Sequence, residues 1–188
     1  MTTQTLPITP APPPETGPDW LPRPGTYTVA PGRGIVELTA RLGPFVTLRG
    51  RLAPTGAALT VDADPAACGM RIEVNSGSLR TGRLLGDSRL RGRRGLYAER
   101  HKSLVFRSEG VEPVDGGERL EVPGDLELRG VPLATTLRLR VVRRADDQLL
   151  VIGAAELPYR PLRRATGFTL PRTAPAGRLR LLVAAEFS

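Results

Sequence analysis

Apolar and polar residues alternate along most of the chain, with a period of two from residue 25 onward. Residues two apart point to the same face of a β-strand, so each alternating segment predicts a strand with one apolar and one solvent-facing side. The segments with this alternation are 36–42, 59–62, 70–75, 104–107, 126–129, 137–141 and 178–181. Strands that are half buried in this way are typical of antiparallel sheets.

Residues that favour turns separate these segments. Turns are predicted at Pro54–Gly56, Asp115–Gly117, Pro123–Asp125 and Asp146–Asp147, where glycine, proline and aspartate cluster. Short strands with such breaks predict an all-β domain, either an antiparallel barrel or a sandwich. The alternation stops within Arg80–Lys102, and four glycines limit any helix there to one or two turns. We therefore expect a short helix with loops, inserted between two strands.

Residues 1–24 differ from the rest of the chain because eight of them are proline. Proline has no backbone N–H to donate and restricts its own backbone, so this density favours an extended or disordered segment. We predict a disordered tail over 1–24 and one folded domain over 25–188, a length that can bury a full hydrophobic core.

The net charge is +8, and most of it is concentrated in one part of the sequence. Segment 80–102 holds eight basic and two acidic residues, a local net charge of +6. Three interpretations fit: arginines that bind a phosphate-bearing head group, a patch that binds an anionic membrane surface, and a solvated insert without a ligand. Nucleic acid is disfavoured, because Tyr97 is the only Phe, Trp or Tyr of the segment and stacking on bases needs several.

The chain offers few residues for catalysis or metal binding. Cys68 and His101 are its only cysteine and histidine, which excludes an internal disulfide and a metal site built from these residues. Nothing in the sequence places Cys68 beside a general base, so we predict no enzymatic activity, no metal and no cofactor. The sequence also has neither the pattern of a signal peptide nor an apolar run long enough to cross a membrane, and we expect a cytoplasmic protein.

The apolar faces of the predicted strands determine what a barrel could hold. An eight-stranded barrel is wide enough either to be filled by its own side chains or to hold one small ligand. An open apolar lumen accepts an apolar ligand, because a polar ligand loses its water without gaining partners. Alternation by itself fits both a filled core and an open lumen. The residues predicted to line this interior are Val36, Leu38, Leu42, Phe45, Leu48, Leu59, Val61, Ile72, Val74, Leu90, Leu104, Phe106, Leu126, Leu128, Leu137 and Leu139.

Five segments, taken in order, resemble those of a known family. They are GTYTVAP at Gly25–Pro31, ARLGPFVTLRGRL at Ala40–Leu52, SLRTG at Ser78–Gly82, DSRL at Asp87–Leu90 and GDLELRGV at Gly124–Val131. Together they are similar to the ordered motifs of the YceI-like family of lipid- or polyisoprenoid-binding proteins. The resemblance extends from about Pro24 to Phe187, nearly the whole chain after the tail.

The resemblance implies an all-β fold, an extended eight-stranded antiparallel barrel of the lipocalin-like type with a short helical insert. It implies that an elongated isoprenoid or other long-chain lipid lies in the lumen, with its polar head near the mouth of the barrel. No catalytic activity is established for the family as a class. The resemblance is also consistent with a homodimer.

Several polar positions of the family pattern are changed in this sequence. Arg33 and Arg89 stand where the family usually has histidine, and Arg94 stands at a usually acidic position. Asp87 matches the aspartate of the family's insert, and we expect it either to pair with Arg89 or Arg83 or to contact the head group. By this resemblance we predict a head-group site made by Arg33, Asp87, Arg89 and Arg94. Three arginines make it more cationic than in typical members and suit it to an anionic head or an anionic membrane surface.

Two functional hypotheses from different classes follow. The first is a non-enzymatic carrier that holds an isoprenoid or other long-chain lipid in the lumen. The second is an interaction module with a filled core that binds an acidic protein partner through segment 80–102. A continuous apolar cavity on the order of several hundred Å³ favours the first hypothesis, and a filled interior favours the second.

Overall fold

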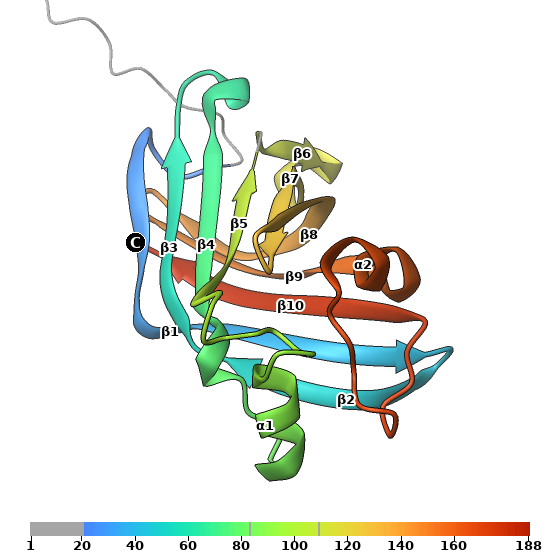
Figure 1. The fold of residues 1–188 in the computed structure, drawn as a ribbon. Helices are drawn as coiled ribbons and strands as arrows, with labels where there is room; N and C mark the ends of the chain where they lie inside the picture. The colour runs from blue at the N-terminus through green and yellow to red at the C-terminus, as the bar shows by residue number, and fades with distance from the viewer. Residues whose placement is uncertain (1–20, 83, 109) are drawn as a thin grey trace, which may run out of the picture.

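The computed structural model describes residues 21–82, 84–108 and 110–188 of the chain (Figure 1). Most of the predicted disordered tail, residues 1–20, lies outside the described residues. Its last four residues are described and lie against the domain: Leu21 is buried, and the Arg23 guanidinium pairs with the Asp146 carboxylate at 2.7 Å. Residues just before residue 25 therefore already contact the folded domain.

Eight antiparallel strands close into a barrel, and the predicted fold class is confirmed. In order around the barrel they are β1 (Gly25–Leu42), β3 (Pro54–Val61), β4 (Gly69–Asn75), β5 (Ser103–Ser108), β7 (Arg119–Leu128), β8 (Val131–Ala145), β9 (Gln148–Pro158) and β10 (Arg178–Phe187). Pairing between β10 and β1 closes the ring. Closure removes the free edges that an open sheet of these strands would expose.

Two further strands extend the barrel wall. β2 (Phe45–Leu52) forms a hairpin with the second half of β1, so that β9, β10, β1 and β2 make one continuous wall (Figure 1). β6 (Glu112–Val114) pairs with the start of β7. The end of the β1–β2 hairpin, where Leu42 pairs with Phe45, lies beyond the last β1–β10 pair, which joins Arg41 to Arg178.

Short helices connect the strands. The helix predicted in segment 80–102 is α1 (Leu84–Arg91). A second helix, α2 (Tyr159–Thr166), follows β9 and was not predicted by the alternation. It ends at Gly167, whose φ of 71° is the left-handed conformation that glycine adopts readily. The 3₁₀ turns of the described residues are η1 (Pro65–Ala67), η2 (Ser76–Ser78) and η3 (Asp115–Gly117).

Two of the four predicted turns are strand in the structure. Pro54–Gly56 opens β3, with an irregular register against β4. Pro123–Asp125 lies inside β7. The neighbour of β7 changes at this point from β5, whose pairs end at Gly124, to β6, whose pairs begin at Glu121. Pro123 therefore lies between the β5 and β6 pairs of β7. Proline has no backbone N–H, and this position tolerates its absence because no β5 or β6 residue pairs with it.

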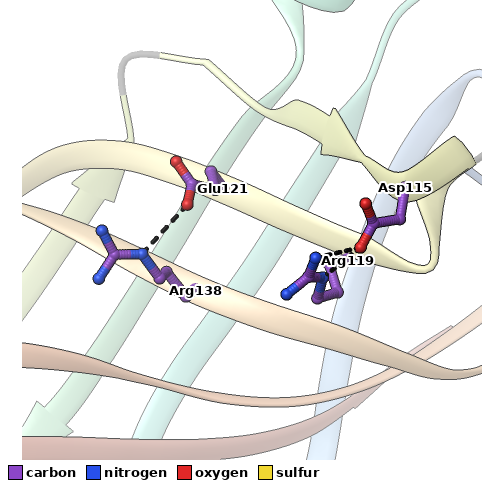
Figure 2. Close-up of polar contacts among 4 residues, drawn as sticks. All are labelled: Asp115, Arg119, Glu121 and Arg138. Atoms are coloured by element: carbon purple, nitrogen blue, oxygen red, sulfur yellow. Dashed lines mark hydrogen bonds and ion pairs between the residues drawn. The ribbon is translucent and has the colours of Figure 1, made fainter.

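The outer wall of the barrel carries paired charges. Figure 2 shows Glu121 of β7 beside Arg138 of β8, with 3.1 Å between carboxylate and guanidinium, and Arg119 bound to Asp115 of η3. Glu121 and Arg138 are direct partners in the β7–β8 register. Opposite charges facing each other across antiparallel strands attract each other, so the charge of Arg138 is balanced by its neighbour Glu121.

Candidate ligand-binding site

The barrel interior is apolar and nearly filled. An apolar cavity inside the barrel measures about 20 Å³. That volume holds about one water molecule, whereas ligand pockets usually measure on the order of 300–1,000 Å³. The residues that line it are Val36, Ile72, Val74, Leu104, Phe106, Leu126, Thr135, Leu137, Ala155, Leu181 and Val183. Seven of these are among the residues predicted to line the lumen, but their side chains occupy most of it.

The other residues predicted to line the lumen fall into three groups. Those buried in the same core but outside the cavity lining are Leu38, Leu59, Val61, Leu90, Leu128 and Leu139. Leu42 and Phe45 lie instead at the exposed end of the β1–β2 hairpin. The β1–β2 register shifts between Ala40 and Arg41, and the hairpin has passed the end of the barrel beyond that point, so its apolar side chains are open to solvent. Leu48 is half-buried and lines a surface hollow next to this hairpin.

A larger hollow lies on the surface, and residues of α1, α2 and segment 167–177, which leads into β10, line it. It measures about 940 Å³, and five arginines line it. We call it the arginine groove. Its arginines are Arg89 of α1, Arg93 and Arg94 of the loop after α1, Arg163 of α2 and Arg172 of segment 167–177. The groove is therefore assembled from three parts of the chain that are distant in sequence.

An adjoining hollow extends from the groove along the β1–β2 hairpin. It measures about 790 Å³ and is lined by Val46, Leu48 and Arg49 of β2 together with Arg89. Arg89 and part of segment 167–177 border both hollows. The hairpin, α1 and segment 167–177 thus lie around neighbouring parts of one surface.

The arginine groove carries an excess of positive charge. Its lining contains no acidic residue among the described residues. Within 21–82, 84–108 and 110–188, none of its five arginines forms an ion pair with a carboxylate. Guanidinium groups bind phosphate and carboxylate groups through forked, charge-assisted hydrogen bonds. The groove therefore suits an anionic group with several oxygens, such as a phosphate or a diphosphate.

A buried carboxylate holds α1 at the groove. Asp87 is only 3% exposed, and its Oδ1 accepts hydrogen bonds from the backbone N–H and the hydroxyl of Thr81, each at 2.6 Å. Burial raises the pKa of Asp87, but the two Thr81 hydrogen bonds and the charges of Arg91 and Arg80 outweigh it, so the pKa lies below its usual value. The ionised Asp87 thereby fixes the helix that carries Arg89.

The loop after α1 is held by two further contacts. The backbone N–H of Thr169 donates to the carbonyl of Arg94 at 2.6 Å and joins the loop to segment 167–177. The guanidinium groups of Arg93 and Arg129 lie 5.8 and 5.9 Å from the centre of the Tyr97 ring, within cation–π range. These contacts order the groove before a ligand binds, which reduces the entropy that binding would otherwise cost.

The arginine groove meets the apolar core at Leu170. This side chain lines the groove, yet it is 7% exposed and belongs to the core cluster. Its backbone N–H donates to the hydroxyl of Tyr159, another lining residue, at 2.9 Å, and the nearby Phe168 is fully buried in the core. Segment 168–170 therefore has arginines on one side and hydrocarbon on the other.

Only two of the four residues predicted to bind a head group lie in the arginine groove. Arg89 and Arg94 both line the arginine groove. Asp87 is buried beside Thr81 and supports α1 rather than lining the groove. Arg33 pairs at 2.8 Å with Glu186, near the end of β10, whereas the groove adjoins the segment that enters the start of β10.

Sequence reasoning missed Arg163, Arg172 and Tyr159 as groove residues. The concentration of charge in segment 80–102 identifies one basic run, although Arg160, Arg163 and Arg164 form a second. A count of charge along the whole chain would have found this run. No sequence signal indicates that the two basic segments lie together in the fold.

The residues with catalytic potential have structural contacts. Cys68 is buried, its Sγ accepts a hydrogen bond from the backbone N–H of Asp62 at 3.4 Å, and burial raises the pKa of its thiol. His101 packs against Tyr97, with 5.9 Å between ring centres. In the described part of the chain, no cluster of three or more His, Cys, Asp or Glu side chains could hold a metal ion. No helix in that part has the length and apolar character needed to span a membrane.

Comparison with known proteins finds one family and several similar folds. Residues 27–174 match the model of a YceI-like domain. Protein YceI of Escherichia coli O157:H7 is 29% identical over 86 residues, which are 46% of this chain and 44% of that protein, so the match spans less than half of the relative's length.

Two solved structures share the fold at low sequence identity. BcnA of Burkholderia cenocepacia aligns with a TM-score of 0.69 and 16% identity, over 84% of this chain and 98% of that one. A polyisoprenoid binding domain from Saccharophagus degradans, implicated in plant cell wall breakdown, aligns with a TM-score of 0.56 and 12% identity, over 86% and 97%. Identities this low establish a common architecture and nothing more specific.

Proposed function

The chain belongs to the YceI-like domain family, and from that premise we propose that it binds a long-chain isoprenoid or other long-chain lipid without changing it chemically. In this proposal the hydrocarbon chain lies in the barrel lumen and an anionic head lies in the arginine groove. The observation that carries this proposal is the position of Leu170, which belongs both to the apolar core and to the lining of the arginine groove. A ligand that occupies both places is an amphiphile with an anionic head.

Two findings support the two ends of such a ligand. The domain from Saccharophagus degradans with the same fold is described as polyisoprenoid binding, which favours a prenyl chain. The five groove arginines favour a phosphate, diphosphate or carboxylate head, because these groups accept several charge-assisted hydrogen bonds. Binding without catalysis is favoured because Cys68 and His101 make separate structural contacts.

The proposal requires the lumen to open. The cavity of about 20 Å³ is too small for a prenyl chain, so the side chains around it must move apart on binding. Each buried methylene contributes about 0.8 kcal/mol, so a chain of about a dozen carbons gains on the order of 10 kcal/mol to offset this displacement. Segment 168–170 lies between groove and core, and we expect Phe168 and Leu170 to move first.

Native mass spectrometry and calorimetry test the proposal. We expect an apolar molecule in the organic extract of protein purified without detergent, and binding of geranylgeranyl diphosphate that is tighter than binding of geranylgeraniol. A protein that carries no apolar ligand and binds neither compound would contradict the proposal.

A cavity-filling variant separates the two halves of the site. Ala155 is buried and lines the cavity, so Ala155→Leu should fill the remaining space, at a stability cost of about 1–3 kcal/mol. We expect this variant to lose geranylgeranyl diphosphate but to keep inorganic diphosphate, which occupies the groove alone. If the variant binds the prenyl compound as tightly as the unchanged protein does, the prenyl chain of the ligand lies outside the lumen.

The small cavity favours a second candidate function. If the core stays filled, the domain acts as an interaction module, and its arginine groove binds an acidic protein. Replacing Arg89 and Arg163 by serine should then abolish capture of that protein, while Ala155→Leu should leave capture unchanged. Binding of prenyl lipids that depends on residue 155 would instead favour the first function.

A further inference from the structure

The end of the β1–β2 hairpin is unusually apolar for an exposed segment. Leu42, Phe45 and Val46 are 47%, 71% and 43% exposed, and Gly43 and Pro44 form the turn between the two strands. Gly43 has a φ of 57°, a left-handed conformation that disfavours most other residues at this point. We call Leu42–Val46 the hairpin tip.

The hairpin tip is held in place next to the arginines. Val46 lines the hollow that also contains Arg89 and Arg49. The carbonyl of Arg41 accepts a hydrogen bond from the backbone N–H of Gly177 at 2.8 Å, which ties the hairpin to the segment that carries Arg172. Figure 1 shows the end of this hairpin beside the loop between α2 and β10. Apolar and cationic groups therefore lie on one side of the molecule.

We propose that this side docks on a lipid bilayer that contains anionic lipids. The hairpin tip enters the interfacial region with Phe45 and its apolar neighbours, and the groove arginines attract anionic head groups around it. A fluid bilayer suits this surface because the apolar residues project at the end of a hairpin and need no shaped pocket to receive them. Basic residues next to an inserted apolar segment supply the second of the two contacts that stable membrane association requires.

The inference goes beyond the proposed function and does not need an occupied lumen. It assigns a role to Leu42 and Phe45, which the closed barrel leaves outside its core. It also specifies the bilayer as the occupant of this surface. An acidic protein partner would use the arginines but would not require the hairpin tip, so the two can be told apart.

Sedimentation with vesicles of mixed phosphatidylglycerol and phosphatidylcholine tests the docking. The variant Phe45→Thr/Val46→Thr should bind these vesicles about tenfold more weakly than the unchanged protein, because the apolar contact is lost. The matched control is Ile35→Thr/Ile152→Thr, which removes two exposed apolar side chains from the strands of the barrel wall. We expect the control variant to bind the mixed vesicles as tightly as the unchanged protein does. Neither the unchanged protein nor the two variants should bind strongly to vesicles of phosphatidylcholine alone.

A fluorescent reporter shows whether the tip enters the bilayer. The chain has one tryptophan, so Phe45→Trp in a Trp20→Phe background places a single probe at the tip. Its emission should shift to the blue with anionic vesicles and should be quenched by brominated lipid. Absence of vesicle binding would overturn the proposal and would favour an acidic protein as the partner of this surface. Binding that survives loss of the tip but not loss of the arginines would also overturn it, because the arginines alone would then attract the anionic vesicles.

The outcome is separable from that of the lipid-binding proposal. Calorimetry with geranylgeranyl diphosphate is done without vesicles, and the tip residues do not line the lumen cavity. The tip variant should therefore keep its affinity for that compound whether or not it binds membranes.

Discussion

Arginines of the outer wall and arginines of the groove have the same side chain but different neighbours. On the wall, Arg138 faces Glu121 across β7 and β8, and Arg107 pairs with Glu127 (Figure 2 shows the first pair). In the groove, Arg89, Arg94 and the other three arginines have no carboxylate partner among the described residues. Wall arginines that lie beside a glutamate are paired with it, whereas the arginines brought together by loops and helix ends at the groove accumulate unpaired charge.

The difference shows that the total charge of the chain does not reveal where unpaired arginines gather. Exposed ion pairs of the kind seen on the wall contribute little to stability, about 0–1 kcal/mol each. Unpaired arginines in a concave site raise the local concentration of anions and can bind them directly. Changing the same residue types in the groove and on the wall tests this difference.

The largest effect is expected from removing groove arginines. Arg89→Ser/Arg163→Ser should weaken binding of geranylgeranyl diphosphate about 100-fold, because two charge-assisted contacts to the head are lost. The wall variant Arg119→Ser/Arg138→Ser removes the same charge and should change the affinity by about twofold or less. Calorimetry at constant salt measures both. Equal losses in the two variants would mean that net charge, rather than the groove, governs binding.

A smaller effect is expected in stability when the support of the groove is removed. Asp87→Ala leaves the backbone N–H and the hydroxyl of Thr81 without their acceptor and should cost about 1–3 kcal/mol of unfolding free energy. The matched change on the wall, Glu121→Ala, should cost less than about 1 kcal/mol because its partner is exposed. Urea denaturation followed by circular dichroism measures both, and similar costs would contradict the assigned role of Asp87.

The contribution of Asp87 should depend on pH in a defined direction. Its folded-state pKa lies below the unfolded value of about 3.9, so its ionised form stabilises the folded state at higher pH. This stabilisation is complete above the unfolded pKa and is lost as the pH falls through the folded pKa. The stability difference between the unchanged protein and Asp87→Asn should therefore be largest at neutral pH and shrink below about pH 4. A difference that is constant from pH 7 to acid would contradict the assignment.

The smallest effect concerns a single ion pair on the wall. A double-mutant cycle with Glu121→Gln and Arg138→Gln should give a coupling energy of about 0.2–1 kcal/mol that decreases in high salt. Thermal unfolding of the four proteins at low and high salt measures it. A coupling that salt does not weaken would mean that this pair is not screened by solvent, unlike the exposed geometry seen here.

Most of the barrel could be predicted because strand alternation is a local property. Leu137, Leu139 and Val141 are apolar at every second position, and the structure places them in β8 with the first two fully buried. β9 was harder to find because Leu150 and Ile152, on its outer face, are apolar like the inner Leu149 and Val151. The helix α2 was missed because it is short, contains a proline and has few apolar residues.

The candidate site was predictable only in part. Arg89 and Arg94 come from one basic segment, and a local count of charge finds them. Arg163 and Arg172 join them because β9 and β10 return the chain to the same end of the barrel. That return depends on which strands pair, and pairing between distant strands leaves no mark in a local pattern.

The sequence by itself determined which side of each strand is apolar and how many charges the insert carries, because both follow from residues next to each other in the chain. Tertiary structure decided that Leu42 and Phe45 face solvent and that five arginines share one groove. It also decided that the lumen retains only about 20 Å³. These features depend on where the barrel ends and on how side chains from opposite strands fill the space between them, and the alternation along one strand contains no information about the strand that faces it.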